Sequence, residues 1–301
     1  MQWLIIYQDN NKSLLQNFTN LLQKYDINAT IFLTSEINNL QIEKINNSIK
    51  NVTHCILLDK TNFDEQKDVD ISFVLGAITS KVSKLFSLNN SHTKKMKFFK
   101  NFYSFDNDNE LFTYLENNLT QIIHEETSKQ AFYDLFNDGI PFTADCFASH
   151  VAKDDRAICE RFLIAGIDVN CRTTEGVPIL NIAIRNEQVE EVKWLLNYNP
   201  DINAISNDRG YSAIMDAVWI NNFELTKLLI EKNPDLNCIG FDGQNVLVLA
   251  VGIGNYSICK LLAENGASPD VKDKMGMSAF EYAKLFNKKE IVDVLSKYHT
   301  E

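Results

Sequence analysis

The sequence predicts an α/β domain over residues 1–137, followed by an all-α solenoid of paired helices over residues 138–301. In the first part, short apolar runs alternate with helical patterns, whereas the second part repeats itself about every 33 residues. The composition changes at the same point, because all five prolines, all five arginines and ten of the eleven glycines lie after residue 137. We therefore expect two domains, joined through the helical stretch at about residues 109–137.

Five short runs rich in β-branched and aromatic residues predict the strands of the first domain. They lie at residues 3–7, 29–34, 53–58, 84–88 and 102–105. Apolar residues three or four positions apart predict helices at about residues 14–22, 40–49 and 71–82, and a long helix from about residue 110. Because the runs are almost continuously apolar, we expect a five-stranded parallel sheet with helices on both faces.

The size and strand pattern of this domain resemble a flavodoxin-like or TIR-like domain. The segment Ser72-Phe73-Val74-Leu75-Gly76-Ala77 is similar to the Phe-Glu-Leu-Gly segment of TIR-like and nucleoside-processing enzymes. The resemblance implies a glutamate that acts on a ribose in glycosidic cleavage, and Val74 holds its position here. Valine neither stabilises a cationic sugar nor takes a proton, so a non-catalytic domain is favoured. The segment is also explained as an amphipathic helix that uses Gly76 for close packing.

A parallel sheet of this kind places a ligand beyond the carboxyl ends of its strands. The residues expected there are Asp9, Asn10, Asp59 and Lys60, which either line a ligand pocket or simply form polar turns. With a single glycine in residues 1–137, no glycine-rich phosphate loop can form in this domain. We expect no cofactor.

Four glycines set the period of the second half. Gly176, Gly210, Gly243 and Gly276 recur at steps of 34, 33 and 33 residues. Each is followed seven residues later by an alanine, namely Ala183, Ala217, Ala250 and Ala283. A bulky apolar pair and then a break with Asn, Pro or Gly complete each unit, which predicts a turn and two short antiparallel helices.

This pattern resembles the ankyrin repeat, with its glycine before the first helix, its alanine inside that helix and its Gly-Ala-Asp-x-Asn turn. Residues 174–299 match in four units, and residues 166–170 end a fifth, degenerate unit that begins near Phe142. The family's Thr-Pro-Leu-His tetrapeptide reads Pro178-Ile179-Leu180-Asn181 and then Ser212-Ala213-Ile214-Met215. This departure leads us to expect fewer hydrogen bonds between repeats.

The resemblance to ankyrin repeats implies a protein-binding concave surface. The positions carried onto it are Arg185, Arg209, Tyr211, Trp219, Ile220, Phe241, Ile253, Met275, Leu285 and Phe286. Exposed Trp, Ile, Phe and Met side chains are costly unless a partner covers them. We expect Trp219, Tyr211, Phe241 and Phe286 to contact a protein partner. Arg185 and Arg209 would orient an acidic group of that partner. In the alternative, these side chains are core between repeats or against the first domain.

The function expected is a protein–protein interaction module whose α/β domain is a scaffold or second recognition surface. The alternative is a TIR-like nucleotide-handling enzyme or nucleotide sensor regulated by its repeats. A net charge of −11 and a pI near 5.0 disfavour nucleic acid as a partner. Six scattered cysteines without a CxxC pair and five isolated histidines give no support for a metal site. Without an export signal or a long apolar stretch, we expect no membrane contact and a cytoplasmic, reducing location.

Overall fold

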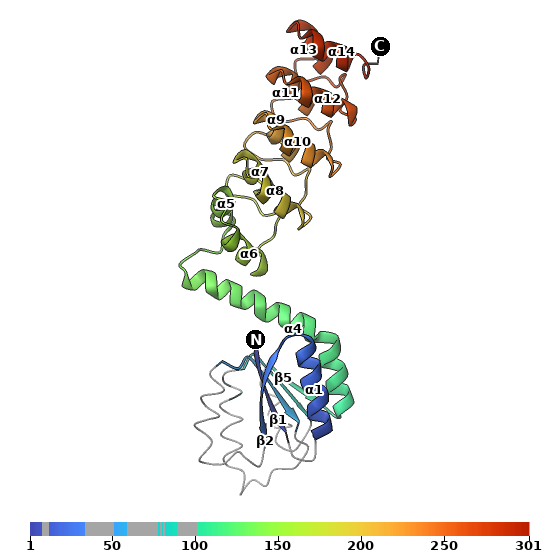
Figure 1. Ribbon diagram of the computed structural model, residues 1–301. Coiled ribbons are helices and arrows are strands. Elements are labelled where there is room, and N and C mark those ends of the chain that lie inside the picture. Colours follow the sequence, from blue (N-terminus) through green and yellow to red (C-terminus); the bar gives the residue numbers. More distant parts are fainter. Residues whose placement is uncertain are drawn as a thin grey trace. The chain divides into compact units, whose positions relative to one another are not determined.

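A computed structural model describes residues 1–7, 12–33, 51–58, 78, 80, 82–88 and 101–300 (Figure 1). The chain divides into two compact units, Met1–Glu126 and Thr127–Glu301. The division falls within helix α4, Asp108–Asn137, which is the stretch expected to join the domains. The expected helix at residues 40–49 and the segment holding Val74 and Gly76 lie outside the described residues.

The first unit contains a parallel sheet, as the sequence predicts. Its strands are β1 Gln2–Tyr7, β2 Asn28–Leu33, β3 His54–Leu58, β4 Lys84–Leu88 and β5 Phe102–Phe105. They pair in the order β2-β1-β3-β4-β5, with every pair parallel. The chain reverses its direction of travel between β1 and β3, as doubly wound sheets do, and this order is consistent with the flavodoxin-like label. The five-stranded parallel sheet is therefore confirmed.

Each strand sends alternate side chains to opposite faces of the sheet. On one face, Trp3, Ile5 and Phe86 pack with the apolar stripe of α1, Lys12–Lys24, and with the first half of α4. On the other face, Leu4, Ile6, Cys55, Leu57 and Leu85 pack with Ile78 and Val82. Figure 1 shows α1 and the start of α4 on the same side of the sheet. The central strand β3 is buried along its whole length because both of its faces are covered.

The second unit stacks five helix pairs after the end of α4. The first helices are α5 Ala144–Ala152, α7 Ile179–Arg185, α9 Ala213–Trp219, α11 Val246–Ile253 and α13 Ala279–Leu285. The second helices are α6 Arg156–Ile164, α8 Val189–Leu196, α10 Phe223–Ile230, α12 Tyr256–Glu264 and α14 Lys289–Leu295. First helices contact first helices from α5 to α13, so they form one layer, and the second helices α8 to α14 form another (Figure 1).

The four alanines that define the repeat are equivalent, as expected. Ala183, Ala217, Ala250 and Ala283 all lie in first helices and are fully buried. A methyl group at this position lets neighbouring helices pack closely, and a single apolar core runs through all five pairs. The predicted arrangement of a turn and two antiparallel helices in each unit is confirmed.

The turn glycines adopt backbone angles that favour glycine. Gly176, Gly210, Gly243 and Gly276 have φ between 74° and 86°. Gly210 has a second constraint, because a Cβ there would lie 2.4 Å from the ring of Phe241 in the next turn. Bridges close a short hairpin around three of these turns, namely Arg172–Pro178, Ile239–Asn245 and Lys272–Ser278, and across the Gly210 turn the Ser206 amide donates to the Tyr211 carbonyl at 3.0 Å. We call these loops the hairpin turns.

Candidate protein-binding surface

Exposed apolar side chains lie on the first helices and in the hairpin turns that precede them. We call this the inner surface, formed by α7, α9, α11 and α13 with the hairpin turns that precede them. Its exposed apolar members are Trp219 (51%), Ile253 (37%), Leu285 (64%) and Phe286 (49%) on the helices, and Phe241 (57%) and Met275 (80%) in the turns. All six are among the residues expected on the concave surface.

Trp219 ends helix α9 and rests on Tyr211. The two rings meet edge to face at a centroid distance of 6.1 Å, and the guanidinium carbon of Arg209 lies 6.0 Å from the Trp219 ring. Tyr211 is only 5% exposed, and its hydroxyl donates a hydrogen bond of 2.8 Å to Asp242 in the next hairpin turn. Burial and this acceptor raise the pKa of Tyr211. Tyr211 therefore packs against Trp219, and its own ring is buried.

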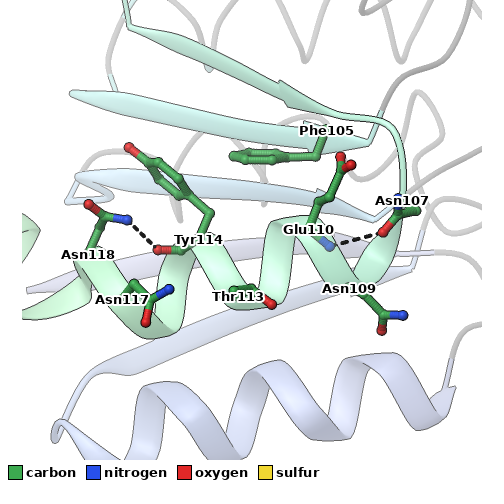
Figure 2. A pocket seen from close by; sticks show the side chains of 8 residues that line it. All are labelled: Phe105, Asn107, Asn109, Glu110, Thr113, Tyr114, Asn117 and Asn118. Carbon is green, nitrogen blue, oxygen red and sulfur yellow. Dashed lines mark hydrogen bonds between the residues drawn. The ribbon is translucent and has the colours of Figure 1, made fainter.

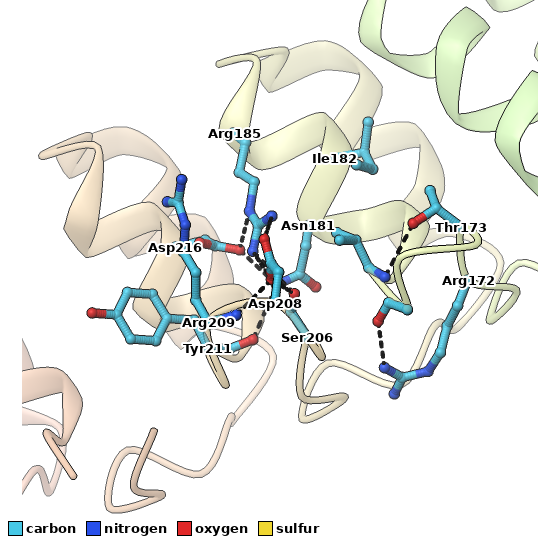
Figure 3. Close-up of polar contacts among 12 residues, drawn as sticks. Arg172, Thr173, Asn181, Ile182, Arg185, Ser206, Asp208, Arg209, Tyr211 and Asp216 are labelled. Atoms are coloured by element: carbon cyan, nitrogen blue, oxygen red, sulfur yellow. Dashed lines mark hydrogen bonds and ion pairs between the residues drawn. The ribbon is translucent and has the colours of Figure 1, made fainter. Parts of the chain in front are cut away.

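Arg185 points into a polar cluster between α7 and α9 (Figure 3). Its Nε donates to Asp216 at 2.8 Å, its Nη1 donates to Asp208 at 2.7 Å, and its Nη2 donates to both Asp208 and Ser206 at 3.1 Å. The hydrogen bonds from Arg185 hold the pKa of Asp208 well below its usual range. These bonds use the N–H donors of the Arg185 guanidinium. Arg185 is therefore not placed to orient an acidic group of a partner, unlike our expectation from the sequence.

Asn181 belongs to the same cluster and changes the expected bonding between repeats. Its Nδ2 donates to Asp216 at 2.8 Å and to the Tyr211 carbonyl at 3.3 Å. Asp216 is fully buried, and burial raises the pKa of its carboxyl. The family tetrapeptide is lost at Asn181, yet hydrogen bonds between α7 and α9 are present. A charge at position 216, where the other repeats hold Ile182, Leu249 and Tyr282, was the sequence signal for this cluster.

Arg209 is placed differently from Arg185. It is exposed, and its guanidinium forms no ion pair among the residues that the structure describes. Ile220, which caps α9, is half-buried against the repeat core. Of the two arginines expected to meet an acidic group, Arg209 is the one without an ion pair among the described residues.

The apolar part of the surface continues into the last repeat. Phe241 lies over Gly210, and the Lys274 ammonium donates a hydrogen bond to the Phe241 carbonyl. The Tyr282 hydroxyl donates to Asp273 at 2.7 Å, and the Tyr282 ring stacks on Phe286 at a centroid distance of 5.6 Å. These contacts thus link side chains from three successive hairpin turns and two helices.

The strand-end residues expected to bind a ligand, Asp9, Asn10, Asp59 and Lys60, lie outside the described residues. A cleft of about 520 Å³ lies where β5 leads into α4 (Figure 2), lined by Phe105, Asn107, Asn109, Glu110, Thr113, Tyr114, Asn117 and Asn118. Asn107 accepts from the Glu110 amide at 3.0 Å, and Asn118 donates to the Tyr114 carbonyl at 2.8 Å. Both hydrogen bonds join residues at the start of α4.

Within the described residues, no three or more His, Cys, Asp or Glu side chains are grouped to hold a metal ion. Among the described helices, none combines the length and the apolar character that crossing a bilayer requires.

The second unit matches a known protein family. A family profile for ankyrin repeats (3 copies) matches residues 147–239 and 215–301. A putative ankyrin repeat-containing protein of Treponema pallidum (strain Nichols) is 35% identical over 167 residues, which cover 56% of this chain and 56% of the relative. A putative ankyrin repeat protein of Acanthamoeba polyphaga mimivirus is 26% identical over 137 residues, covering 45% of this chain and 18% of the relative.

A third relative is the B-cell lymphoma 3 protein homolog of Mus musculus, 26% identical over 132 residues, covering 42% of this chain and 30% of the relative. The chain therefore spans less than two thirds of the length of each of these three relatives.

Proposed function

The chain belongs to the ankyrin-repeat family, and from that premise we propose that it binds a protein partner through the inner surface of its repeats. The observation that carries this proposal is the run of exposed apolar side chains on α9, α11, α13 and their hairpin turns. A contiguous apolar patch of this kind is costly in water and is typical of protein-interaction sites. Large aromatic side chains in such patches commonly dominate the binding energy.

Trp219, Phe241 and Phe286 are the proposed anchors. Each is about half exposed, and each is held by a neighbour that limits its motion: Tyr211 under Trp219, Gly210 under Phe241 and Tyr282 beside Phe286. A side chain that is already ordered loses less conformational entropy on binding than a free one. This ordering supports their role as contacts, with Met275, Leu285 and Ile253 extending the apolar area.

We propose that the first domain is a non-catalytic scaffold or a second recognition surface. Val74 in place of the glutamate of TIR-like enzymes supports this assignment. A cytoplasmic location is supported by the six cysteines, all of which are free thiols, since disulfides are rare in reducing compartments.

The test is affinity capture with the full chain and three variants. Trp219→Ala and Phe286→Ala should lose the protein that the unchanged chain retains. Tyr198→Ala, which removes a ring of similar exposure from the end of a second helix, should retain it. All variants should unfold within about 2 °C of the unchanged chain, because the altered side chains are exposed. If all three variants retain the partner protein equally, the inner surface is not the binding site.

A further inference from the structure

The cleft where β5 leads into α4 has the size and the position of a small-molecule site. Its volume of about 520 Å³ lies within the range of ligand pockets, roughly 300–1,000 Å³. It lies at the carboxyl end of β5, and doubly wound sheets bind their ligands beyond the carboxyl ends of the strands. The described lining residues all belong to the first unit, so the cleft is separate from the inner surface of the repeats.

Two aromatic rings form one wall of the cleft. The ring centroids of Phe105 and Tyr114 are 5.1 Å apart, and both residues are half-buried. Tyr114 also contacts Tyr103 at a centroid distance of 5.8 Å and the fully buried Phe86 at 6.1 Å. These contacts hold the Tyr114 ring in place, so the wall is ordered before a ligand binds.

Uncharged polar groups make up most of the remaining lining. Six of the eight described lining residues carry an amide or a hydroxyl group: Asn107, Asn109, Thr113, Tyr114, Asn117 and Asn118. Each amide group offers both donors and an acceptor, and each hydroxyl can do both. Figure 2 shows Asn118 and Glu110 on the same side of α4 as the two rings.

Hydrogen bonds within the chain orient three of these polar side chains. Asn107 accepts from the Glu110 amide at 3.0 Å, Asn118 donates to the Tyr114 carbonyl at 2.8 Å, and Glu110 Oε2 accepts from the Asp106 amide at 3.1 Å. Each side chain keeps a second polar atom, namely Asn107 Nδ2, Asn118 Oδ1 and Glu110 Oε1. These three atoms form no hydrogen bond with the part of the chain that the structure describes, so they can bond a ligand.

The charges around the cleft disfavour an anionic ligand. None of its described lining residues is a lysine or an arginine, and Asp106, Asp108 and Glu110 make this end of α4 negative. Phosphate sites use cationic side chains or free backbone N–H groups at a helix start, and Asn107 already accepts from the Glu110 amide here. The ligand that fits these groups is therefore uncharged.

We propose that this cleft binds an uncharged carbohydrate. The apolar C–H face of one sugar ring stacks on Tyr114 and Phe105, and its hydroxyl groups bond Glu110 and the asparagine side chains. A sugar carries several hydroxyls that each donate and accept, which matches a lining rich in amides. A nucleoside fits less well, because a base presents a few fixed donors and acceptors at its edge.

The proposed activity is binding and not hydrolysis. Glycoside hydrolysis commonly uses two carboxyl groups on opposite sides of the scissile bond. Glu110 is the one carboxylate among the described lining residues. Its Oε1 would accept a hydrogen bond from a sugar hydroxyl, and a charged acceptor strengthens such a bond.

The test is ligand-observed NMR with the full chain. The probes are maltotriose, cellotriose, mannotriose and triacetylchitotriose, each at about 5 mM, because an open cleft with a few hydrogen bonds supports a Kd of about 1 mM. At least one trisaccharide should receive saturation from the protein at the C–H protons of one ring face. The same protons should move upfield, because they lie over aromatic rings. Glucuronic acid and AMP, which are anionic, should give no signal.

Three substitutions on α4 locate the site. Asn117→Ala and Asn118→Ala should each weaken trisaccharide binding about fivefold or more. Gln121→Ala removes an amide from the same helix but outside the cleft, and it should leave binding unchanged. Asn117→Ala should also raise the melting temperature by about 1 °C, because alanine favours the helix more than asparagine does. Weaker binding by a stabilised protein is not explained by unfolding.

Three outcomes would overturn the inference. The first is that none of the four trisaccharides binds. The second is binding that both Asn117→Ala and Asn118→Ala leave unchanged, which would put the sugar elsewhere on the chain. The third is binding of adenosine or AMP that Asn118→Ala weakens while no sugar binds, which would assign the cleft to nucleosides. Trp219→Ala should leave sugar binding unchanged, so this test is independent of the protein-binding function proposed for the repeats.

Discussion

Asp216 carries a carboxylate into the interior between α7 and α9, where the other repeats place apolar or aromatic side chains. Its Oδ2 accepts from Arg185 and Asn181, whereas its buried Oδ1 has no hydrogen-bond partner among the residues that the structure describes. A buried ion pair of this kind is expensive to break, because removal of one member leaves the other charged and unpaired.

Loss of Arg185 should be costly to folding. Arg185→Ala should lower the free energy of unfolding by about 3–5 kcal/mol, since Asp216 is left buried without its cation. The double variant Arg185→Leu with Asp216→Leu installs the residues that other repeats hold at these positions, Leu285 and Leu249. We expect the double variant to return to within about 1 kcal/mol of the unchanged chain in urea unfolding. A cost below about 1 kcal/mol for Arg185→Ala would contradict this account.

Asp208 should make part of the stability depend on pH. The pKa of its carboxyl is lowered in the folded chain by hydrogen bonds from Arg185. The stabilisation is therefore complete above the unfolded pKa, near 4, and is lost as the pH falls below it toward the folded pKa. Asp208→Asn should cost about 1 kcal/mol at pH 7, because the site is partly exposed, and this difference should shrink below about pH 4. Urea unfolding at pH 7 and pH 3 measures it; a constant difference would disprove the linkage.

The sequence predicted which residues stand on the inner surface better than what each one does. The register of the repeat is enough to predict that Trp219, Phe241 and Phe286 lie on this surface, where all three are exposed. Arg185 and Tyr211 share that register, but Asp216 and Asp242 from the next repeat draw them inward. Pairing between repeats depends on which two side chains meet in space. The sequence pattern of a single repeat therefore does not predict it.

At the scale of helices, one buried and one exposed leucine should behave differently. Leu229 is fully buried in α10, whereas Leu285 ends α13 and is mostly exposed. Leu229→Ala should lower the free energy of unfolding by about 2–5 kcal/mol, because it opens a cavity in the layer of second helices. Leu285→Ala should change it by about 0.5 kcal/mol or less. Equal costs in chemical denaturation would show that the two helix layers are not as described.

Two glycine substitutions should have opposite signs. Gly210→Ala forces an L residue into a left-handed turn and against Phe241, so it should destabilise the chain by about 1 kcal/mol or more. Gly252→Ala should stabilise it by about 0.5–1 kcal/mol, because alanine favours the helix and a Cβ there would meet no atom within 4 Å. The melting temperatures of the two variants, measured against the unchanged chain, check the signs, and a stabilising Gly210→Ala would mean that its turn is not held as described.

The existence of the strands was predictable, but their order was not. The runs that became β2 and β3 look equally apolar, yet β2 is only half-buried at the edge of the sheet and β3 is buried throughout. Burial of a strand depends on its neighbours in the sheet, which the local pattern does not contain. The arrangement of the repeats was easier to predict because each unit contacts only adjacent units. The order of the units in space is therefore their order along the chain.

At the scale of the whole molecule, α4 belongs to both units. Leu111, Leu115 and Leu119 from its first half pack under the sheet, whereas Leu135 near its end is fully buried in the repeat core. A terminal repeat has only one neighbouring repeat and needs a cap on its other side. The last turns of α4 provide that cap for α5 and α6, so we place the working boundary of the repeat domain at residue 127 and not at 138.

Two fragments test this boundary. Residues 127–301 keep Ala131 and Leu135, both buried, and residues 138–301 lack them. The longer fragment should unfold in one cooperative transition. The shorter fragment should be less stable by about 2–5 kcal/mol, because loss of the Leu135 side chain alone should cost as much as a large-to-small substitution in the core of the first repeat. Leu135→Ala in the longer fragment should reproduce most of that loss, whereas Phe136→Ala, which removes a neighbouring exposed ring, should not. Equal stability of the two fragments would place the boundary at residue 138, where the break in composition alone had put it.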